Sequence, residues 1–219
     1  MGSVEIDQLE LVIFSHIITY GNAADAIVTE RIREEIETMW NEPMASVAVD
    51  GSLYAVVFKI TASFEPGITD LEIIQNTDPR NNYFRIEVFS GNNISFVDDV
   101  GSNSGYFKLD NLYKGSTTAA HEYGHTLGLD HPHHTDLRGM GIPGIMYPRG
   151  TFVDPPFQYD PSKPAGVPGG TMNPIHRKVV QKDIDNLKLQ QLDFENGVAI
   201  LGAFTNVWHE DHSILPPGF

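Results

Sequence analysis

The chain has 219 residues, 41% of them hydrophobic, which is enough to bury the core of one large domain. Twenty-nine acidic residues against 14 basic ones give a formal net charge of -15, which would repel a nucleic acid backbone and an anionic membrane surface. Cysteine is absent, so disulfides, thiol nucleophiles and cysteine-ligated metals are excluded, and any metal must be held by histidine or carboxylate side chains.

The first half of the chain predicts a mixed sheet with one helix packed on it. Residues 9–20 are rich in β-branched and aromatic side chains, which is typical of a strand. A helix should follow, because Asn22 can cap it and apolar residues recur at four-residue steps from Val28 to Trp40. Between residues 45 and 110 the apolar positions alternate, which indicates several further strands.

The second half predicts two helices separated by a long irregular segment. Residues 117–127 are expected to form a helix that stops at Gly128, and a last helix is expected within residues 179–192. Residues 132–172 are rich in proline and glycine, with methionine and aromatic residues interspersed. This composition indicates an ordered loop region rather than a flexible linker.

The sequence HEYGHTLGLDH contains the candidate site. His121 and His125 are one helical turn apart, so both imidazoles can bind one cation. Glu122 is placed beside them, where it can contact a water on the metal and act as general base. Gly128 can adopt a positive φ and turn the chain, which would bring His131 back as a third ligand. Three neutral histidines leave the fourth position of a tetrahedral zinc open, as in catalytic sites.

The alternative to a metal site is that the motif matches by chance. A bare HExxH pattern on a surface helix arises by chance fairly often and would be weak support for a metal site. Here five residues are fixed over eleven positions. At ordinary residue frequencies the chance expectation for a chain of this length is on the order of 10⁻⁴. The pattern therefore favours a metal site.

This stretch resembles the signature of the metzincin metallopeptidases, HExxHxxGxxH followed by a methionine turn. The second part is also present, since residues 144–148 read GIMYP and Met146 follows His131 by fifteen positions. The resemblance implies that Met146 lies beneath the zinc-binding histidines as an apolar base and does not bind the metal. It also implies that Tyr147 packs near the specificity pocket, because Pro148 stands where astacins and serralysins have a metal-binding tyrosine.

Within this clan the chain is most similar to matrixins, in both motifs and in the sequence VQKDID at residues 180–185, whereas Pro132 after the third histidine resembles serralysins. The resemblance implies an α+β metzincin fold in which residues 1–219 form a single metallopeptidase catalytic domain. Residues 1–131 would be an upper subdomain with a mixed twisted sheet and two helices. Residues 132–219 would be a loop-rich lower subdomain with one C-terminal helix.

The activity that the resemblance implies is zinc-dependent endopeptidase activity on a protein or peptide substrate. One catalytic Zn²⁺ would activate a water, with Glu122 as the general base and no covalent intermediate. The substrate would add as a strand to the sheet edge, which we predict at residues 105–111. Arg149 has two interpretations, a place at the mouth of the specificity pocket or an ordinary surface position. If the acid excess extends over the cleft, it should favour basic substrate residues.

Two family features are in question. The cysteine switch that keeps matrixins latent cannot operate in a chain without cysteine. No histidine between His16 and His121 matches the additional structural metal sites of matrixins. Structural Ca²⁺ is weakly supported, since only acidic loop residues such as Asp98 and Asp99 are candidates for binding it.

The remaining histidines have simpler interpretations than metal binding. His133 and His134 follow the third ligand in a segment without regular spacing, which is typical of a solvated loop. We expect structural roles for His16, in the first strand, and for His176, before the last helix. The sequence HEDH at residues 209–212 resembles a metal-binding run, but a polar tail explains it equally well.

Two other functions stay open at this point. The chain can be a non-catalytic, zinc-stabilised protein-binding module, or the catalytic module of a larger toxin or effector with one protein target. We expect a monomer without membrane insertion, because no stretch of about 18 apolar residues occurs. The expected location is secreted or cell-envelope, after removal of a signal that this sequence lacks, or cytoplasmic or effector-delivered if Met1 is the native start.

Overall fold

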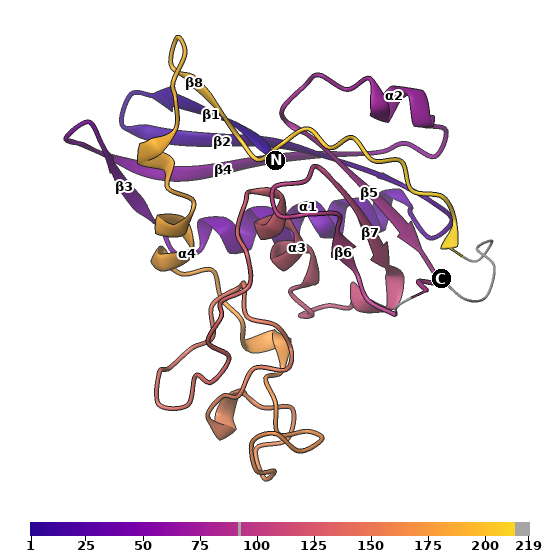
Figure 1. Ribbon diagram of the computed structural model, residues 1–219, viewed down its shortest axis with the longest axis vertical. Helices are drawn as coiled ribbons and strands as arrows, with labels where there is room; N and C mark the ends of the chain where they lie inside the picture. Colours follow the sequence, from indigo (N-terminus) through magenta and orange to yellow (C-terminus); the bar gives the residue numbers. More distant parts are fainter. Residues whose placement is uncertain (92, 213–219) are drawn as a thin grey trace.

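The computed structural model describes residues 1–91 and 93–212, which contain one eight-stranded mixed sheet and four α-helices (Figure 1). The strands are β1 Gly2–Asp7, β2 Glu10–Tyr20, β3 Ser46–Val49, β4 Ser52–Phe64, β5 Asn81–Glu87, β6 Phe96–Val97, β7 Ser104–Lys108 and β8 Val198–Leu201. The α-helices are α1 Ala26–Asn41, α2 Asp70–Ile74, α3 Thr118–Thr126 and α4 Gln181–Asn186, and short 3-10 helices lie at Leu109–Asn111, Pro155–Phe157, Pro174–His176 and Leu189–Gln191.

Strand β2 is the centre of the sheet. On one side it pairs in parallel with β4. On the other side its first half pairs antiparallel with β1 and its second half pairs in parallel with β5. The main path of the sheet is β3-β4-β2-β5-β7-β6, and β8 extends it by pairing with β1. The predicted α+β class with a mixed sheet is therefore confirmed.

The two faces of β2 pack against different parts of the chain. Ile17 belongs to the main core, and the hydroxyl of Thr19 is 2.6 Å from that of Thr29 on α1. Ile18 points to the opposite face, where it packs with Ile73 of α2. Figure 1 shows α1 and α3 together on one side of the strands and α2 on the other. Side chains alternate between the two faces of a strand, and both faces of β2 are covered. Apolar residues therefore occur at consecutive positions over much of this strand.

Helix α1 begins later than the sequence predicts. Its N-cap is Asp25, whose side chain accepts a hydrogen bond of 2.7 Å from the backbone N–H of Val28. Asn22, the predicted cap, lies outside the helix and accepts a hydrogen bond from the backbone N–H of Val88 instead. The predicted apolar stripe from Val28 to Trp40 is buried. Asp25 was missed as the cap because both residue types favour this position.

Strands β1 and β8 and helix α2 are absent from the sequence prediction. Strand β1 is added at the N-terminus, and β8 pairs with it antiparallel, which returns residues 198–201 to the sheet. The predicted division into subdomains at residue 131 stays a prediction. Helix α2 brings the helices before residue 131 to three rather than two. Its five residues are too few for an apolar period, and a capping box of Thr69 and Glu72 holds its start.

The last predicted helix is interrupted. Helix α4 covers Gln181–Asn186, and a 3-10 turn follows at Leu189–Gln191. Lys188 between them has φ 53°, a left-handed conformation that ends the helix.

No helix in the described residues combines the length and apolar character that crossing a bilayer requires.

Helix α3, which carries the candidate site, is packed between α1 and the sheet. The indole N–H of Trp40 on α1 donates a 3.1 Å hydrogen bond to the carbonyl of Ala120. Tyr123 packs edge-on against the Trp40 ring, and its hydroxyl lies 2.8 Å from that of Ser15 on β2. Trp40, Tyr123 and Ser15 are all buried, so these contacts fix the helix against α1 and the sheet.

The N-terminus of α3 is capped from another helix. Its own N-cap residue, Thr117, has φ 54° and makes no side-chain capping bond. A carboxylate oxygen of Glu35 on α1 instead accepts a 3.2 Å hydrogen bond from the backbone N–H of Ala120. Burial raises the pKa of Glu35 above its usual value, while the N–H groups of Ala120 and Ala119 act in the opposite direction.

Replacing Glu35 should therefore loosen α3. We expect Glu35→Ala to lower the free energy of unfolding by about 1–2 kcal/mol, the usual effect of losing a helix cap. Glu35→Gln retains an acceptor and should lose less. Because the folded protein holds the Glu35 proton more tightly than the unfolded chain, wild-type stability should fall as pH rises from 4.5 through the raised pKa.

Urea denaturation of the wild type and both variants between pH 4 and 8 measures these effects. The Glu35→Gln variant should lack the part of the pH dependence that comes from this carboxyl group. Equal losses for the two variants at every pH would show that the carboxylate does not cap α3.

Candidate metal centre

Helix α3 places His121 and His125 one turn apart, as the sequence predicts. The Nδ1 atom of His121 lies 2.7 Å from the carbonyl oxygen of Ile145, and that of His125 lies 2.7 Å from the carbonyl oxygen of Leu129. A carbonyl only accepts, so each ring donates its Nδ1–H proton there. The Nε2 lone pair of each ring is therefore free to bind a metal.

His131 completes the group. Its Nε2 atom lies 3.0 Å from Nε2 of His121 and 3.1 Å from Nε2 of His125. Zinc–nitrogen bonds of 2.0–2.1 Å in a tetrahedral site correspond to nitrogen separations of about 3.3 Å. The three donors thus converge at nearly the spacing that zinc requires. No other group of three possible ligands lies as close together in the described part of the chain.

The electrostatic surroundings keep these histidines neutral. Burial lowers the pKa of His121 well below its usual value, and the nearby guanidinium of Arg177 lowers it further. Burial is also the largest cause of the lowered pKa of His125 and of His131. Because a metal binds the neutral imidazole, these shifts favour binding.

Gly128 turns the chain between the second and third histidines. It has φ +96°, and its N–H donates a 3.0 Å hydrogen bond to the carbonyl of His125. A Cβ at this position would meet no atom within 4 Å, so the need for glycine is conformational and not steric. The turn predicted from the sequence is present and brings His131 back over α3.

Met146 packs directly against α3. Its side chain is buried, and a Cβ added to Gly124 would overlap its sulfur and lie 3.2 Å from the Trp40 ring. Gly124 is therefore required by the close approach of Met146 and Trp40 to the helix. This role of Gly124 cannot be predicted from the sequence, since a glycine inside HExxH has no spacing signal of its own.

The loop that carries Met146 is held by Asp183 on α4. The Asp183 carboxylate accepts hydrogen bonds from the backbone N–H of Val180, at 2.9 Å, and of Ile145. Burial raises the pKa of Asp183 to about 6, while these N–H groups act to lower it. Since the carbonyl of Ile145 in turn accepts from His121, Asp183 and the first ligand are connected through one peptide segment.

Arg177 is a second residue that sequence reasoning did not single out. It is 3% exposed, and its guanidinium donates to the Thr117 hydroxyl at 2.8 Å and to the carbonyls of Ser116 at 3.0 Å and Tyr147 at 3.2 Å. Burial lowers its pKa to about 10. Arg177 thereby joins the segment before α3 to the segment that follows Met146.

Glu122 lies in the same cavity as the histidines. This cavity has a volume of about 270 Å³, and its lining includes His121, His131 and Glu122. The Glu122 side chain is buried, which raises its pKa to about 8 against the opposing effects of Arg177, Arg149 and the backbone N–H of Val97. A carboxyl group with such a pKa can both accept and donate a proton near neutral pH.

The residues after Met146 divide between the cavity and the lower core. Pro148 and Arg149 line the cavity of about 270 Å³. Tyr147 packs its side chain against the apolar cluster of Leu137, Val153 and Met172, and its backbone carbonyl accepts a hydrogen bond from Arg177. Of the two interpretations of Arg149, the structure supports a place in the cavity wall.

The sheet edge near the site differs from the prediction. Residues 105–111 were predicted as the edge, but β7 pairs with β5 on one side and with β6 on the other. The edge strand is β6, Phe96–Val97, and the backbone N–H of Val97 donates to the Glu122 carboxylate. The prediction was wrong because a two-residue strand has no recognisable period.

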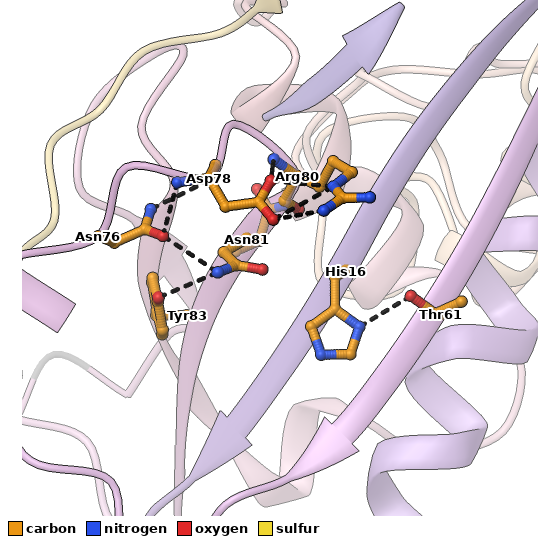
Figure 2. A network of polar contacts seen from close by, with 8 residues as sticks. His16, Thr61, Asn76, Asp78, Arg80, Asn81 and Tyr83 are labelled. Carbon is orange, nitrogen blue, oxygen red and sulfur yellow. Dashed lines mark hydrogen bonds and ion pairs between the residues drawn. The ribbon is translucent and has the colours of Figure 1, made fainter. Parts of the chain in front are cut away.

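His16 lies away from this site, in a polar cross-strand contact. Its Nδ1 is 2.8 Å from the hydroxyl of Thr61, and its Nε2 is 3.2 Å from the hydroxyl of Ser63 on β4. Figure 2 shows the imidazole beside a separate hydrogen-bonded loop in which Asp78 binds Arg80. Both ring nitrogens have hydroxyl partners, which agrees with the predicted structural role.

The HEDH run is not a free tail. The His212 ring stacks on Tyr106 with ring centroids 3.6 Å apart, and Nε2 of His209 lies 2.9 Å from the carboxylate of Asp98. The interpretation of residues 209–212 as a polar tail was therefore wrong. The local sequence does not indicate this packing, because both partners lie about 110 positions away along the chain. Asp98, a candidate for binding calcium, is paired with His209.

The other three histidines lie in the lower region. His133 and His134 are exposed, and the His176 ring packs edge-on against Phe157 with centroids 5.7 Å apart. Asp99, the second calcium candidate, accepts a hydrogen bond from the backbone N–H of Val100.

Comparisons with known proteins add little to this geometry. No known family matches the chain, and no curated protein matches it. A solved structure, described as the structure of myroilysin, is similar at 15% sequence identity with a TM-score of 0.30. The match covers 65% of this chain and 60% of that chain, so the chain spans less than two thirds of its length.

The contact between Gly124 and Met146 gives a direct test of how α3 is seated. We expect Gly124→Ala to lower the free energy of unfolding by about 1–3 kcal/mol, because the added methyl group overlaps Met146. Met146→Ala removes the overlapped sulfur and should recover part of this loss in the double variant. Chemical denaturation of the two single variants and the double variant measures the coupling. Strictly additive losses would mean that the two residues do not share this contact.

Proposed function

We propose that the protein is a zinc-dependent endopeptidase of the metzincin type that hydrolyses peptide bonds in a protein or peptide substrate. One observation carries the proposal: Nε2 of His131 lies 3.0 Å from Nε2 of His121 and 3.1 Å from Nε2 of His125, and the three histidines line one cavity together with the buried Glu122. The finer assignments, a matrixin-like subtype and a secreted monomer, rest on the sequence resemblance alone.

The three histidines would hold the metal. Zinc, when bound, supplies a positive charge that polarises a carbonyl group and lowers the pKa of water toward about 7. The carbonyls of Ile145 and Leu129 keep the protons of His121 and His125 on Nδ1, so that Nε2 is the donor in both rings. Backbone carbonyl groups thus determine which ring nitrogen of His121 and of His125 can bind the metal.

Glu122 would perform the proton transfers. Its carboxylate accepts a proton from the attacking water and then donates it to the leaving amine of the cut peptide. Burial suits it to both steps, because the raised pKa of about 8 makes the carboxylate a stronger base near neutral pH. The N–H of Val97 on the edge strand orients the carboxylate by hydrogen bonding.

Substitution of Glu122 separates proton transfer from metal binding. We expect Glu122→Ala to reduce casein cleavage by about 10²–10⁴-fold or to abolish it, with one zinc per chain retained. His125→Ala should lose both activity and zinc, because two donors remain. Casein hydrolysis together with metal analysis measures the two effects. Cleavage by the Glu122→Ala variant at the wild-type rate would exclude this mechanism.

Metal removal tests the other part of the proposal. A zinc chelator should abolish cleavage of a peptide library by the wild type, and added zinc should restore it. A protein that binds one zinc and cuts no peptide of a broad library would instead be the non-catalytic binding module.

A further inference from the structure

The cavity beside Glu122 carries an excess of positive charge. Besides Glu122, its charged lining residues are Arg149 and Arg177, and its volume of about 270 Å³ is that of a side-chain pocket. Arg149 is exposed and stands after the methionine turn, while Arg177 is buried. The cavity lining thus contains one carboxylate, that of Glu122 beside the candidate metal site, and two guanidinium groups.

Neither guanidinium is paired with a carboxylate. Arg177 donates to the neutral oxygens of Thr117, Ser116 and Tyr147, and its Nη1 atom also lies 3.0 Å from Nδ1 of His121. Arg149 lies 3.4 Å from the Thr118 hydroxyl and 6.0 Å from the centroid of the Tyr113 ring. Among the described residues no ion pair includes either arginine. Burying a charge without a partner is costly, so a group that supplies the missing negative charge would be stabilised there.

A neighbouring cavity at the histidines is lined by charges of the opposite sign. A second cavity of about 290 Å³ shares Glu122 and His131 with the first and is lined by Asp99 and Asp130 and by the edge strand β6. The two sides of the candidate scissile bond would therefore meet different charges. A preference for a negative group should be confined to one side of the cut.

We propose that the Arg149–Arg177 cavity receives a carboxylate of the substrate next to the scissile bond. The proposal rests on the peptidase function proposed above. A guanidinium and a carboxylate match in charge and in hydrogen-bonding geometry, and the apolar alternative would cover Arg177 without pairing it. The carboxylate can come from an aspartate or glutamate side chain or from the C-terminus of the substrate.

The zinc-loaded protein and a mixed peptide library show which source applies. In C-terminally amidated peptides, we expect cuts beside Glu or Asp on one side only, with kcat/KM at least about tenfold higher for a Glu peptide than for its Gln counterpart. If the C-terminal carboxylate is the group bound, cuts should instead lie near free C-termini and be lost on amidation. Either result supports the cavity assignment.

Arg149→Glu tests the assignment on an exposed residue that should not affect folding. We expect it to lower the Glu-to-Gln ratio, or the acid-to-amide ratio, about tenfold. Lys114→Glu is the matched control, since it makes the same charge change at an exposed position outside the cavity. Arg177 is unsuited to this test because its hydrogen bonds join two segments of the site and it contacts the His121 ring.

Two negative results have different meanings. Cleavage without any dependence on a carboxylate, or with equal effects of Arg149→Glu and Lys114→Glu, would overturn the inference and leave the peptidase intact. If no peptide is cut, the proposed function fails, and calorimetry of the Glu and Gln peptides on the zinc-loaded protein decides the inference. Tighter binding of the Glu peptide would support it, and equal binding would overturn it.

Discussion

The position of α3 is the constraint on which the rest of the site depends. Trp40 and the sheet hold it from one side, and Met146 approaches it so closely from the other that position 124 must be glycine. The helix is only nine residues long, too short to be stable by itself in water. Its two histidines are therefore aligned by tertiary contacts, and the loop that carries Met146 also supplies the carbonyl that orients His121.

This arrangement makes the histidine group a product of both halves of the chain. Asp183 on α4 binds the N–H of Ile145, and the carbonyl of the same residue binds the first histidine. Glu35 on α1 binds the start of α3 from the opposite direction. Displacement of either anchor would move Nε2 of His121 relative to the other two donors. The geometry of the site therefore depends on the packing of the fold.

The sequence was sufficient for the parts of the site that are local. Eleven consecutive residues contain the histidines, Glu122 and the turn glycine, and helical geometry determines how most of them meet. Glu35 and Arg177 were missed because their partners are 85 and about 60 residues away, and a single charged residue has no period. The same limit applies to β6 and β8, since pairing across a sheet depends on contacts that no local pattern encodes.

The net charge of the chain does not determine the charge at the candidate site. A charge of -15 would favour basic substrate residues if it extended over the cleft. Charges on the exposed surface are screened over about 8–10 Å at physiological salt, whereas charges in a partly closed cavity are screened much less. The groups that line the cavities at Glu122 therefore outweigh the total, and these are two arginines in one cavity and two aspartates in the neighbouring one. If the proposed peptidase function holds, the acid excess would attract a basic protein from a distance, while the cavity with the two arginines would select the residue next to the scissile bond.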